Sequence, residues 1–200
     1  YFINTIYLNV INMFNSSNIQ AQNNNTPLTP GPSVGITLVS VTKGEKDELK
    51  FNFKGIDPGN IGVFTHTIFA IDPTDSRWTQ VKQDRDMASI LHIGARFASE
   101  DEARAAFNGS DWTSYSNNVV KFFTDARIKG VKLRGKITIR VANEGTSEQK
   151  VYNQFPMFPN FLSSEKYPTQ FSTNPTYDRY TLGAVETPDV MDKDKGDLPF

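Results

Sequence analysis

Alternating apolar and polar residues predict strands in the first third of the chain. Residues 34–41 alternate around β-branched side chains, and residues 49–54 place apolar side chains on one face and polar side chains on the other. The turn-like segment 43–46 lies between them, so the two segments are predicted to form a β-hairpin. Residues 63–71 are again strand-like, after a loop rich in Asp, Pro, Gly and Asn.

The middle of the chain changes to helical spacing. Apolar residues recur every three or four positions over residues 86–107, which predicts one or two helices. Ser99 followed by Glu102 is a capping-box pattern that starts a new helix. A further helix is predicted over residues 114–128, ending before Gly130, a residue typical of helix C-caps.

The most regular alternation lies at residues 131–141 and predicts another strand. The residues expected to face the core are Val131, Leu133, Ile137, Ile139 and Val141. The residues expected to face solvent are Lys132, Arg134, Lys136, Thr138 and Arg140. Residues 149–155 are predicted to return as the partner strand after a turn at residues 143–146.

Strands, then helices, then strands predict a single α+β domain of mostly antiparallel sheet over residues 34–161. An OB-type β-barrel with a helical insertion is the most economical closure, because closing a sheet removes its exposed edges. The aromatic residues expected in the core are Phe51, Phe53, Phe97, Phe107 and Phe123.

The two ends of the chain are predicted to lie outside this domain. Residues 1–33, rich in Asn, Gln, Ser and Thr, are expected to form a disordered arm. Within it, residues 1–12 are interpreted as translated upstream sequence before Met13, or alternatively as a genuine N-terminal strand. Residues 162–188 form an extended Pro/Tyr-rich segment that wraps the domain, stacks on nucleic acid or makes oligomer contacts. Residues 189–200 form a polar, partly acidic tip that is too polar to fold alone.

Composition removes several classes of function. The 200 residues carry 21 Lys and Arg against 22 Asp and Glu, so the net charge of −1 lacks the strongly basic footprint of a protein that reads duplex DNA. There is no cysteine, and two isolated histidines cannot build a zinc centre without several carboxylates, so no metal or other cofactor is expected. No nucleophile elbow, phosphate loop or dinucleotide fingerprint is present, and an enzyme is not expected.

The remaining polar features have structural explanations. His92 is expected to be a core histidine bonded to the backbone, and His66 is expected to pair similarly within a strand. No apolar run is long enough to span a membrane and no secretory signal is recognisable. These observations favour a cytoplasmic protein with no membrane partner.

Basic and aromatic residues supply the candidate binding chemistry. The basic side chains of the strand at residues 131–141 recur at multiples of about 6.6 Å, close to the phosphate spacing of an extended single strand. Solvated strand surface that resists aggregation is the alternative explanation of such a row. The predicted nucleic-acid-binding residues are Lys132, Arg134, Lys136, Arg140, Lys50, Lys54, Trp78, Trp112, Tyr152, Phe155 and Phe158.

The last four residues, Asp197-Leu198-Pro199-Phe200, resemble the acidic C-terminal tip of bacterial and phage single-stranded DNA-binding proteins (SSBs). A ring, a proline and a terminal carboxylate suit a shallow apolar pocket rimmed by basic side chains. Residues 86–161 are similar in order to phage SSB-like proteins, with Ile-Leu-His-Ile-Gly-Ala-Arg-Phe at residues 90–97, an amphipathic helix, a strand and a Pro/aromatic segment. The residues that the resemblance assigns to partner binding are Asp194, Asp197, Leu198, Pro199 and Phe200.

The resemblance implies an OB-like protein that coats single-stranded DNA without sequence preference during replication, recombination and repair. The tip would recruit replication and repair proteins in a bacterial host cytoplasm, with a homo-oligomer as one possible state. Two other functions remain open at this point. One is a virion structural or assembly protein, and the other is a carbohydrate-binding β-domain that stacks Trp78 and Trp112 on sugar rings.

Overall fold

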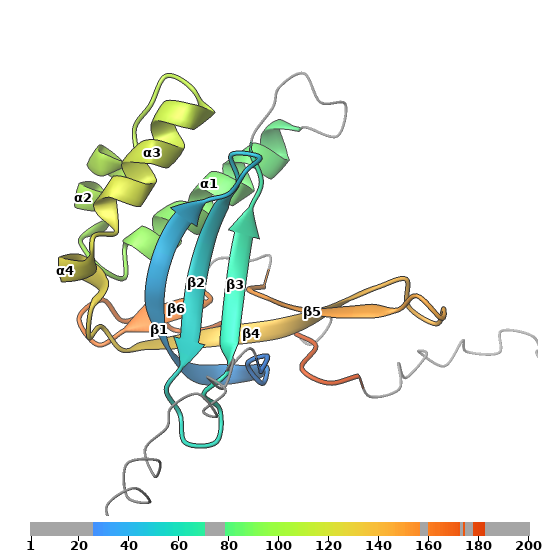
Figure 1. Cartoon of the computed structure of the whole chain (residues 1–200). Helices are drawn as coiled ribbons and strands as arrows, with labels where there is room; N and C mark the ends of the chain where they lie inside the picture. The colour runs from blue at the N-terminus through green and yellow to red at the C-terminus, as the bar shows by residue number, and fades with distance from the viewer. Residues whose placement is uncertain (1–25, 71–78, 157–159, 173, 175–177, 183–200) are drawn as a thin grey trace, which may run out of the picture.

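The computed structural model of the chain describes residues 26–70, 79–156, 160–172, 174 and 178–182. In this part of the chain, three strands are followed by four helices and three further strands (Figure 1). The strands are β1 (Gly31–Lys43), β2 (Leu49–Gly55), β3 (Val63–Ile68), β4 (Leu133–Ala142), β5 (Lys150–Gln154) and β6 (Leu162–Ser164). The helices are α1 (Gln80–Gly94), α2 (Glu100–Ala106), α3 (Trp112–Phe122) and α4 (Asp125–Ile128).

All of these strands pair in an antiparallel sense, in the order β3-β2-β1-β4-β5, with β6 also pairing with β4. The long strand β1 belongs to two ladders, because Ile36 lies opposite Gly55 of β2 and also opposite Leu133 of β4. Register shifts in β1 accompany this change of partner, and such bulges bend and twist a strand. The sheet therefore curves, and β4 with β5 runs across the direction of β1–β3 (Figure 1).

Among the described residues, no ladder joins the two ends of this order, β3 and β5, so the sheet is open. The predicted α+β class and antiparallel pairing are confirmed, whereas the predicted closed barrel is not observed. The outer part of β4, the turn and β5, residues 139–154, project from the body as a two-stranded ribbon that we call the arm (Figure 1).

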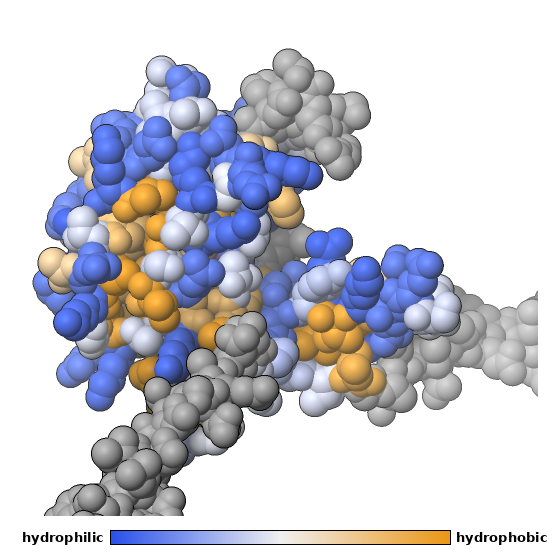
Figure 2. Space-filling model, viewed as in Figure 1, coloured by the Kyte–Doolittle hydropathy of each residue, from blue (hydrophilic) through white to orange (hydrophobic). Residues whose placement is uncertain are grey.

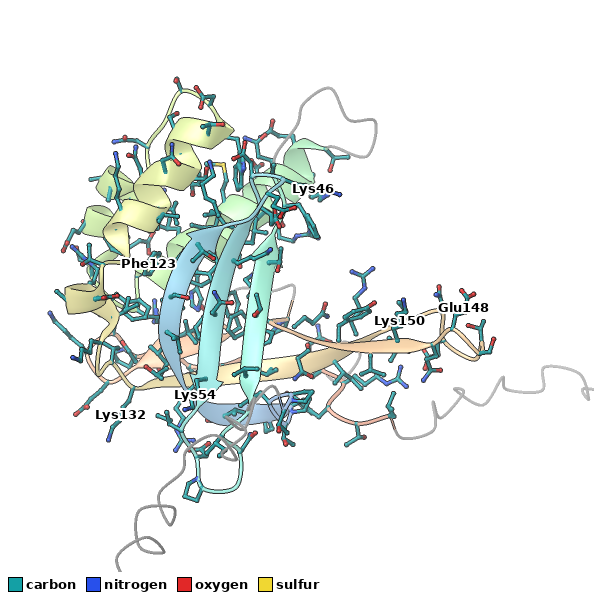
Figure 3. The ribbon with its side chains drawn as sticks, viewed as in Figure 1. Lys46, Lys54, Phe123, Lys132, Glu148 and Lys150 are labelled. Atoms are coloured by element: carbon teal, nitrogen blue, oxygen red, sulfur yellow. The ribbon has the colours of Figure 1, made fainter. Side chains whose placement is uncertain are left out.

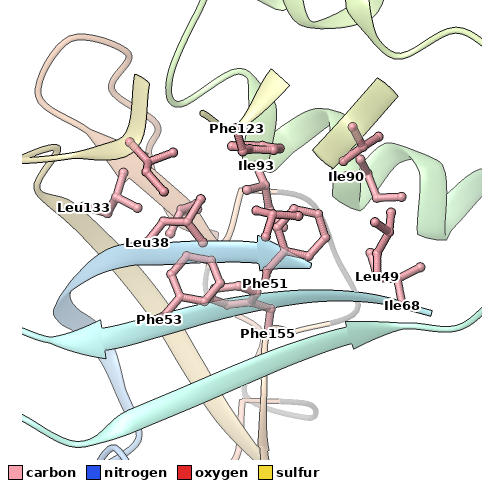
Figure 4. Packing of buried hydrophobic residues seen from close by; sticks show 14 of the residues in the cluster. Leu38, Leu49, Phe51, Phe53, Ile68, Ile90, Ile93, Phe123, Leu133 and Phe155 are labelled. Atoms are coloured by element: carbon pink, nitrogen blue, oxygen red, sulfur yellow. The ribbon is translucent and has the colours of Figure 1, made fainter. Parts of the chain in front are cut away.

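The core lies between one face of β1–β3 and the helices. Phe51 and Phe53 of β2 are almost fully buried, and Phe51 meets Phe123 edge to face at 5.7 Å between ring centroids (Figure 4). Buried Ile90 and Ile93 come from α1. The core aromatics predicted from the sequence are confirmed: four are buried and Phe97 packs against the cluster. Helices thus cover one face of β1–β3 and leave the outer face open.

Local capping explains where the helices begin. The Ser99 side chain accepts a hydrogen bond from the Glu102 backbone N–H, as predicted. Asp111 and Ser114 form a reciprocal capping box, which starts α3 slightly earlier than the apolar spacing indicated. The predicted helix at residues 114–128 is divided into α3 and α4, because Phe123 leaves the helical conformation. Gly130, with a φ of 78°, makes the turn into β4.

Two predicted boundaries are wrong. Residues 26–33 were assigned to a disordered arm, yet Leu28 is 1% exposed and β1 begins at Gly31. Leu28 is held through its carbonyl, which accepts a hydrogen bond from the Asn153 amide. At the other boundary, residues 162–164 belong to the sheet as β6 rather than to the predicted extended segment.

The described part of the segment after β6 wraps the domain, which was one of the three alternatives for it. Arg96 donates to the Tyr167 carbonyl at 2.8 Å and also bonds Thr169. Two segments for which the sequence makes predictions lie outside the described residues. They are the N-terminal segment at residues 1–25 and the C-terminal tip at residues 189–200. None of the described helices combines the length and apolar character needed to cross a bilayer.

Candidate nucleic-acid interface

The basic row predicted on β4 is divided by the fold. Lys136 is 4% exposed, forms an ion pair with Asp178 and donates to the Ser172 carbonyl at 2.5 Å. Thr138 is fully buried. The prediction that Lys136 and Thr138 face solvent is therefore wrong, because chain that follows β6 contributes partners that cover this face of β4. Lys136 cannot contact a phosphate in this conformation.

Lys132, Arg134 and Lys54 remain exposed on the outer side of the sheet. Lys54 lies opposite Thr37 of β1, whose hydroxyl donates to the Val131 carbonyl at 3.0 Å. Lys132 follows Val131, and Figure 3 shows Lys54 and Lys132 at the same end of the sheet. Arg134 is paired with Asp57 at 3.0 Å, in a solvent-exposed ion pair.

The middle of this outer face is polar, and exposed Val63 lies opposite Lys54 at its end. Asn52 bridges the three strands, because its amide donates to the Ser40 hydroxyl at 3.0 Å and accepts from the Thr65 hydroxyl at 2.9 Å. Lys50 lies further along β2 and pairs with Glu48 at 2.9 Å. This face offers hydroxyls, amides and ammonium groups rather than aromatic rings.

A cleft of about 800 Å³ lies between β3, α1 and the arm. Figure 2 shows the surface hollowed between the body and the arm. Two aromatic side chains on its lining are exposed: Phe69, just after β3, is 65% exposed and Tyr152 of β5 is 50% exposed. Arg140 lies directly opposite Tyr152 in the β4–β5 ladder, so the two side chains leave the arm on the same face.

The cleft lining carries more positive than negative charge. Its cations are Lys82 and Arg85 of α1 and Arg140 of β4, and its carboxylate is Asp86. Asp86 accepts from Arg85 at 3.2 Å, so Arg85 is partly neutralised. Cations and exposed rings therefore share one open cleft, with one group on the body and another on the arm.

His66 lines the cleft from β3 and is uncharged near neutral pH. Burial lowers its pKa to about 4. Its Nε2 lies 3.4 Å from the Ser89 hydroxyl, and its ring packs 5.1 Å from that of Phe155. The polar neighbour of His66 is thus the Ser89 side chain of α1, rather than a group within its strand as expected from the sequence.

Phe155 belongs to the core and does not form an exposed stacking platform, contrary to the sequence-based prediction. It is 4% exposed, stacks on Phe161 at 4.4 Å and meets Phe64 edge to face at 4.9 Å. The residue that follows β5 therefore inserts its ring between the two halves of the sheet, where it lines the cleft but is almost fully covered.

His92 is a core histidine, as predicted. Its Nε2 accepts a hydrogen bond from the Leu162 backbone N–H at 3.1 Å, and its ring lies 4.6 Å from Phe161. Burial, followed by the nearby Arg96 charge, lowers its pKa to about 4.

Trp112 is engaged in the structure and does not form a free stacking platform. Its indole N–H donates to the Asp47 carbonyl at 2.8 Å, and its ring stacks on Tyr115 at 5.9 Å. The side chain thus ties the start of α3 to the turn between β1 and β2. The predicted residues Trp78 and Phe158, and the partner-binding residues Asp194, Asp197, Leu198, Pro199 and Phe200, lie outside the described residues.

The cleft lining also contains Phe69, Lys82 and Arg85, which are not among the residues predicted from the sequence. Phe69 lies in the segment 63–71 that is predicted to be a strand, and the two basic residues precede the predicted start of the first helix. No sequence spacing links them to Arg140, because tertiary folding alone brings these elements together.

Comparison with known proteins gave no matching family model, no similar curated protein and no similar solved structure. In the part of the chain that the structure describes, no group of three or more His, Asp or Glu side chains could hold a metal ion.

Proposed function

We propose that this chain is a non-enzymatic single-stranded DNA-binding protein that coats its ligand without sequence preference. The observation that supports the proposal best is the open cleft in which Arg140 and Tyr152, neighbours on the arm, share a lining with Phe69 and with Lys82 of the body. Bases stack on exposed rings for about 1–3 kcal/mol each, and cations neutralise the adjacent phosphates. Splayed bases are available in single strands and not in a duplex.

The fold supports an OB-like interpretation. A bent β1 pairs with both β2 and β4, and the helices are inserted between β3 and β4. In OB-folds the outer faces of strands 2 and 3 and the adjacent loops bind oligonucleotides. The corresponding face here carries Lys50, Asn52 and Lys54, so we propose that a strand continues from the cleft over this face toward Lys132 and Arg134. The C-terminal tip, from Asp194 to Phe200, would recruit replication and repair proteins.

The proposal is tested by fluorescence anisotropy of a labelled oligo(dT) at several salt concentrations, with a duplex of equal length as control. We expect strand-selective binding whose log affinity falls linearly with log salt, by about 0.7 for each phosphate neutralised. Absence of binding at low salt would refute the proposal. Stable assemblies formed without nucleic acid would then favour a virion structural protein, and salt-insensitive glycan binding would favour a carbohydrate-binding domain.

Replacing Arg140 with Ala is expected to lower the salt slope by about 0.7, because one phosphate contact is lost. The matched control is Arg104→Ala. Arg104 is exposed on α2, is paired with Glu100 at 2.6 Å and is absent from the cleft lining. Both variants lose one positive charge, so equal slopes for the two would show that Arg140 acts only through net charge.

Replacing Tyr152 with Ala is expected to weaken oligo(dT) binding about tenfold at every salt concentration, since stacking involves no counterion release. Tyr152→Phe keeps the ring and should retain nearly all of the affinity. The Tyr152 side chain is half exposed, so thermal melting should change little in either variant. Equal loss in both variants would exclude stacking and point to the hydroxyl.

A further inference from the structure

The arm forms one wall of the cleft, yet it has little support of its own. It is a two-stranded ribbon that projects from the body (Figure 1). A two-stranded hairpin is at best marginally stable in water. Its outer part also carries the exposed apolar residue Val151, opposite Val141. Additional contacts must therefore hold the ribbon at a defined position if Arg140 and Tyr152 are to face the cleft.

Those contacts come from a segment after β6. We call its described part the clasp, which consists of Ser172, Asn174 and residues 178–182. The clasp contacts β4 and the arm at three places. At the root, buried Lys136 bonds both the Asp178 carboxylate and the Ser172 carbonyl. In the middle, the Ile139 N–H donates to the Arg179 carbonyl at 2.8 Å. At the turn, the Arg179 guanidinium lies 2.8 Å from the Glu144 carboxylate.

Asp178, which anchors the clasp to β4, also forms hydrogen bonds within the clasp. Asp178 accepts a hydrogen bond from the Asn174 backbone N–H at 2.7 Å, and its own N–H donates to the Asn174 carbonyl at 2.8 Å. The side chain of Asp178 is 4% exposed, and that of its partner Lys136 is 5% exposed. One buried carboxylate thus joins the loop of the clasp to β4, and the next residue, Arg179, reaches the arm.

We propose that the clasp positions the arm and thereby holds the cleft in its binding geometry, with Asp178 and Arg179 as positioning residues that do not touch the ligand. The ligand in this inference is that of the proposed function, single-stranded DNA. Residues 136, 139 and 144 lie progressively further along β4 and into its turn, so the three contacts act on the ribbon from its root to its tip. Loss of the outermost contact should loosen the arm without unfolding the body.

The first experiment measures hydrogen exchange on the unliganded full chain and compares Glu144→Gln and Arg179→Ala with the unaltered protein. We expect faster exchange of amides in β5, residues 150–154, and unchanged exchange in β1 and β2. Glu100→Gln and Arg104→Ala are the matched controls, because they break an exposed ion pair on α2 with the same changes of charge. Unchanged exchange in β5 would overturn the proposal, and so would faster exchange spread equally over β1, β2 and β5.

The second experiment measures the affinity for oligo(dT). Here the change of charge and the change in the position of the arm predict affinity changes of opposite sign. Glu144→Gln removes a negative charge, so electrostatics alone predicts tighter binding to a polyanion. A positioning role predicts weaker binding, by about threefold, the scale of an exposed ion pair, and Glu100→Gln should not weaken it. Tighter or unchanged binding by Glu144→Gln would overturn the positioning role. If the unaltered chain binds no oligo(dT), the proposed function fails, and the exchange measurement still decides whether the clasp holds the arm.

Discussion

Lowering the pH from 7.5 to 5 is expected to remove about 4 kcal/mol of folding stability, about 2 kcal/mol for each of the two partly buried histidines. His66 and His92 each have a pKa of about 4 in the folded protein, against an ordinary value of 6.5. Between these values the unfolded chain binds the proton and the folded chain does not. Stability is therefore complete above pH 6.5 and falls as the pH decreases toward 4.

The physical causes differ in detail between the two histidines. His66 is desolvated among Phe51, Phe64 and Phe155, and its polar neighbour Ser89 carries no charge. Protonation of His92 would also break the hydrogen bond that its Nε2 accepts from Leu162, and it would place a second cation near Arg96. Both effects favour the neutral ring.

Urea denaturation at several pH values between 5 and 7.5 measures this loss. The window lies above the ordinary pKa range of carboxylates, so the histidines dominate it. His66→Phe should flatten the pH dependence by about half, because one of two equal contributions is removed. A curve for His66→Phe as steep as that of the unaltered protein would show that His66 titrates normally in the folded state.

Replacing Asp178 with Ala is expected to cost about 3–5 kcal/mol of stability, because it leaves the Lys136 ammonium buried without its counter-charge. The ammonium would keep the Ser172 carbonyl as a hydrogen-bond partner, but a neutral acceptor does not compensate a desolvated charge. Chemical denaturation near pH 7 measures the change.

The double variant Lys136→Met, Asp178→Leu is the informative control. It removes both charges and fills a similar volume, so its stability should return to within about 1 kcal/mol of the unaltered protein or exceed it. A double variant as unstable as Asp178→Ala would show that the ion pair contributes more than the cost of an unpaired charge. Exposed Lys132→Met should change stability by less than about 0.5 kcal/mol.

Alternation along the sequence predicted the elements well where one face of a strand meets the core and the other meets solvent. β2 is such a strand, and its Leu49, Phe51 and Phe53 are all buried as expected. β4 is different, because the chain that follows β6 covers its second face. Alternation assigns Lys136 to the side opposite Ile137, and it contains no information about whether that side is covered.

The lining of the proposed binding cleft was predictable only in part, for a related reason. Arg140 and Tyr152 could be selected because each lies in a recognisable strand, and the ladder makes them neighbours. Phe69 and Lys82 join them only because the fold brings β3 and α1 to the same cleft as the arm. Phe155 was misplaced because its Pro-rich surroundings resemble surface chain, whereas the end of β5 directs its ring into the core.

The double pairing of β1 has a consequence for how the chain folds during synthesis. Contacts that complete the β1–β4 half join residues far apart, such as Thr37 with Val131, 94 positions later, and Leu28 with Asn153, 125 positions later. Pairings of such long range make folding slow, because the loop between them must be closed first. While the ribosome makes the helices, β1 and β2 can already form a hairpin, but the edge of β1 that pairs with β4, from Gly31 to Ile36, stays unpaired until β4 emerges. The nascent chain therefore carries an unpaired strand edge for about half of its synthesis, and this interval is when it is most exposed to aggregation and to chaperones.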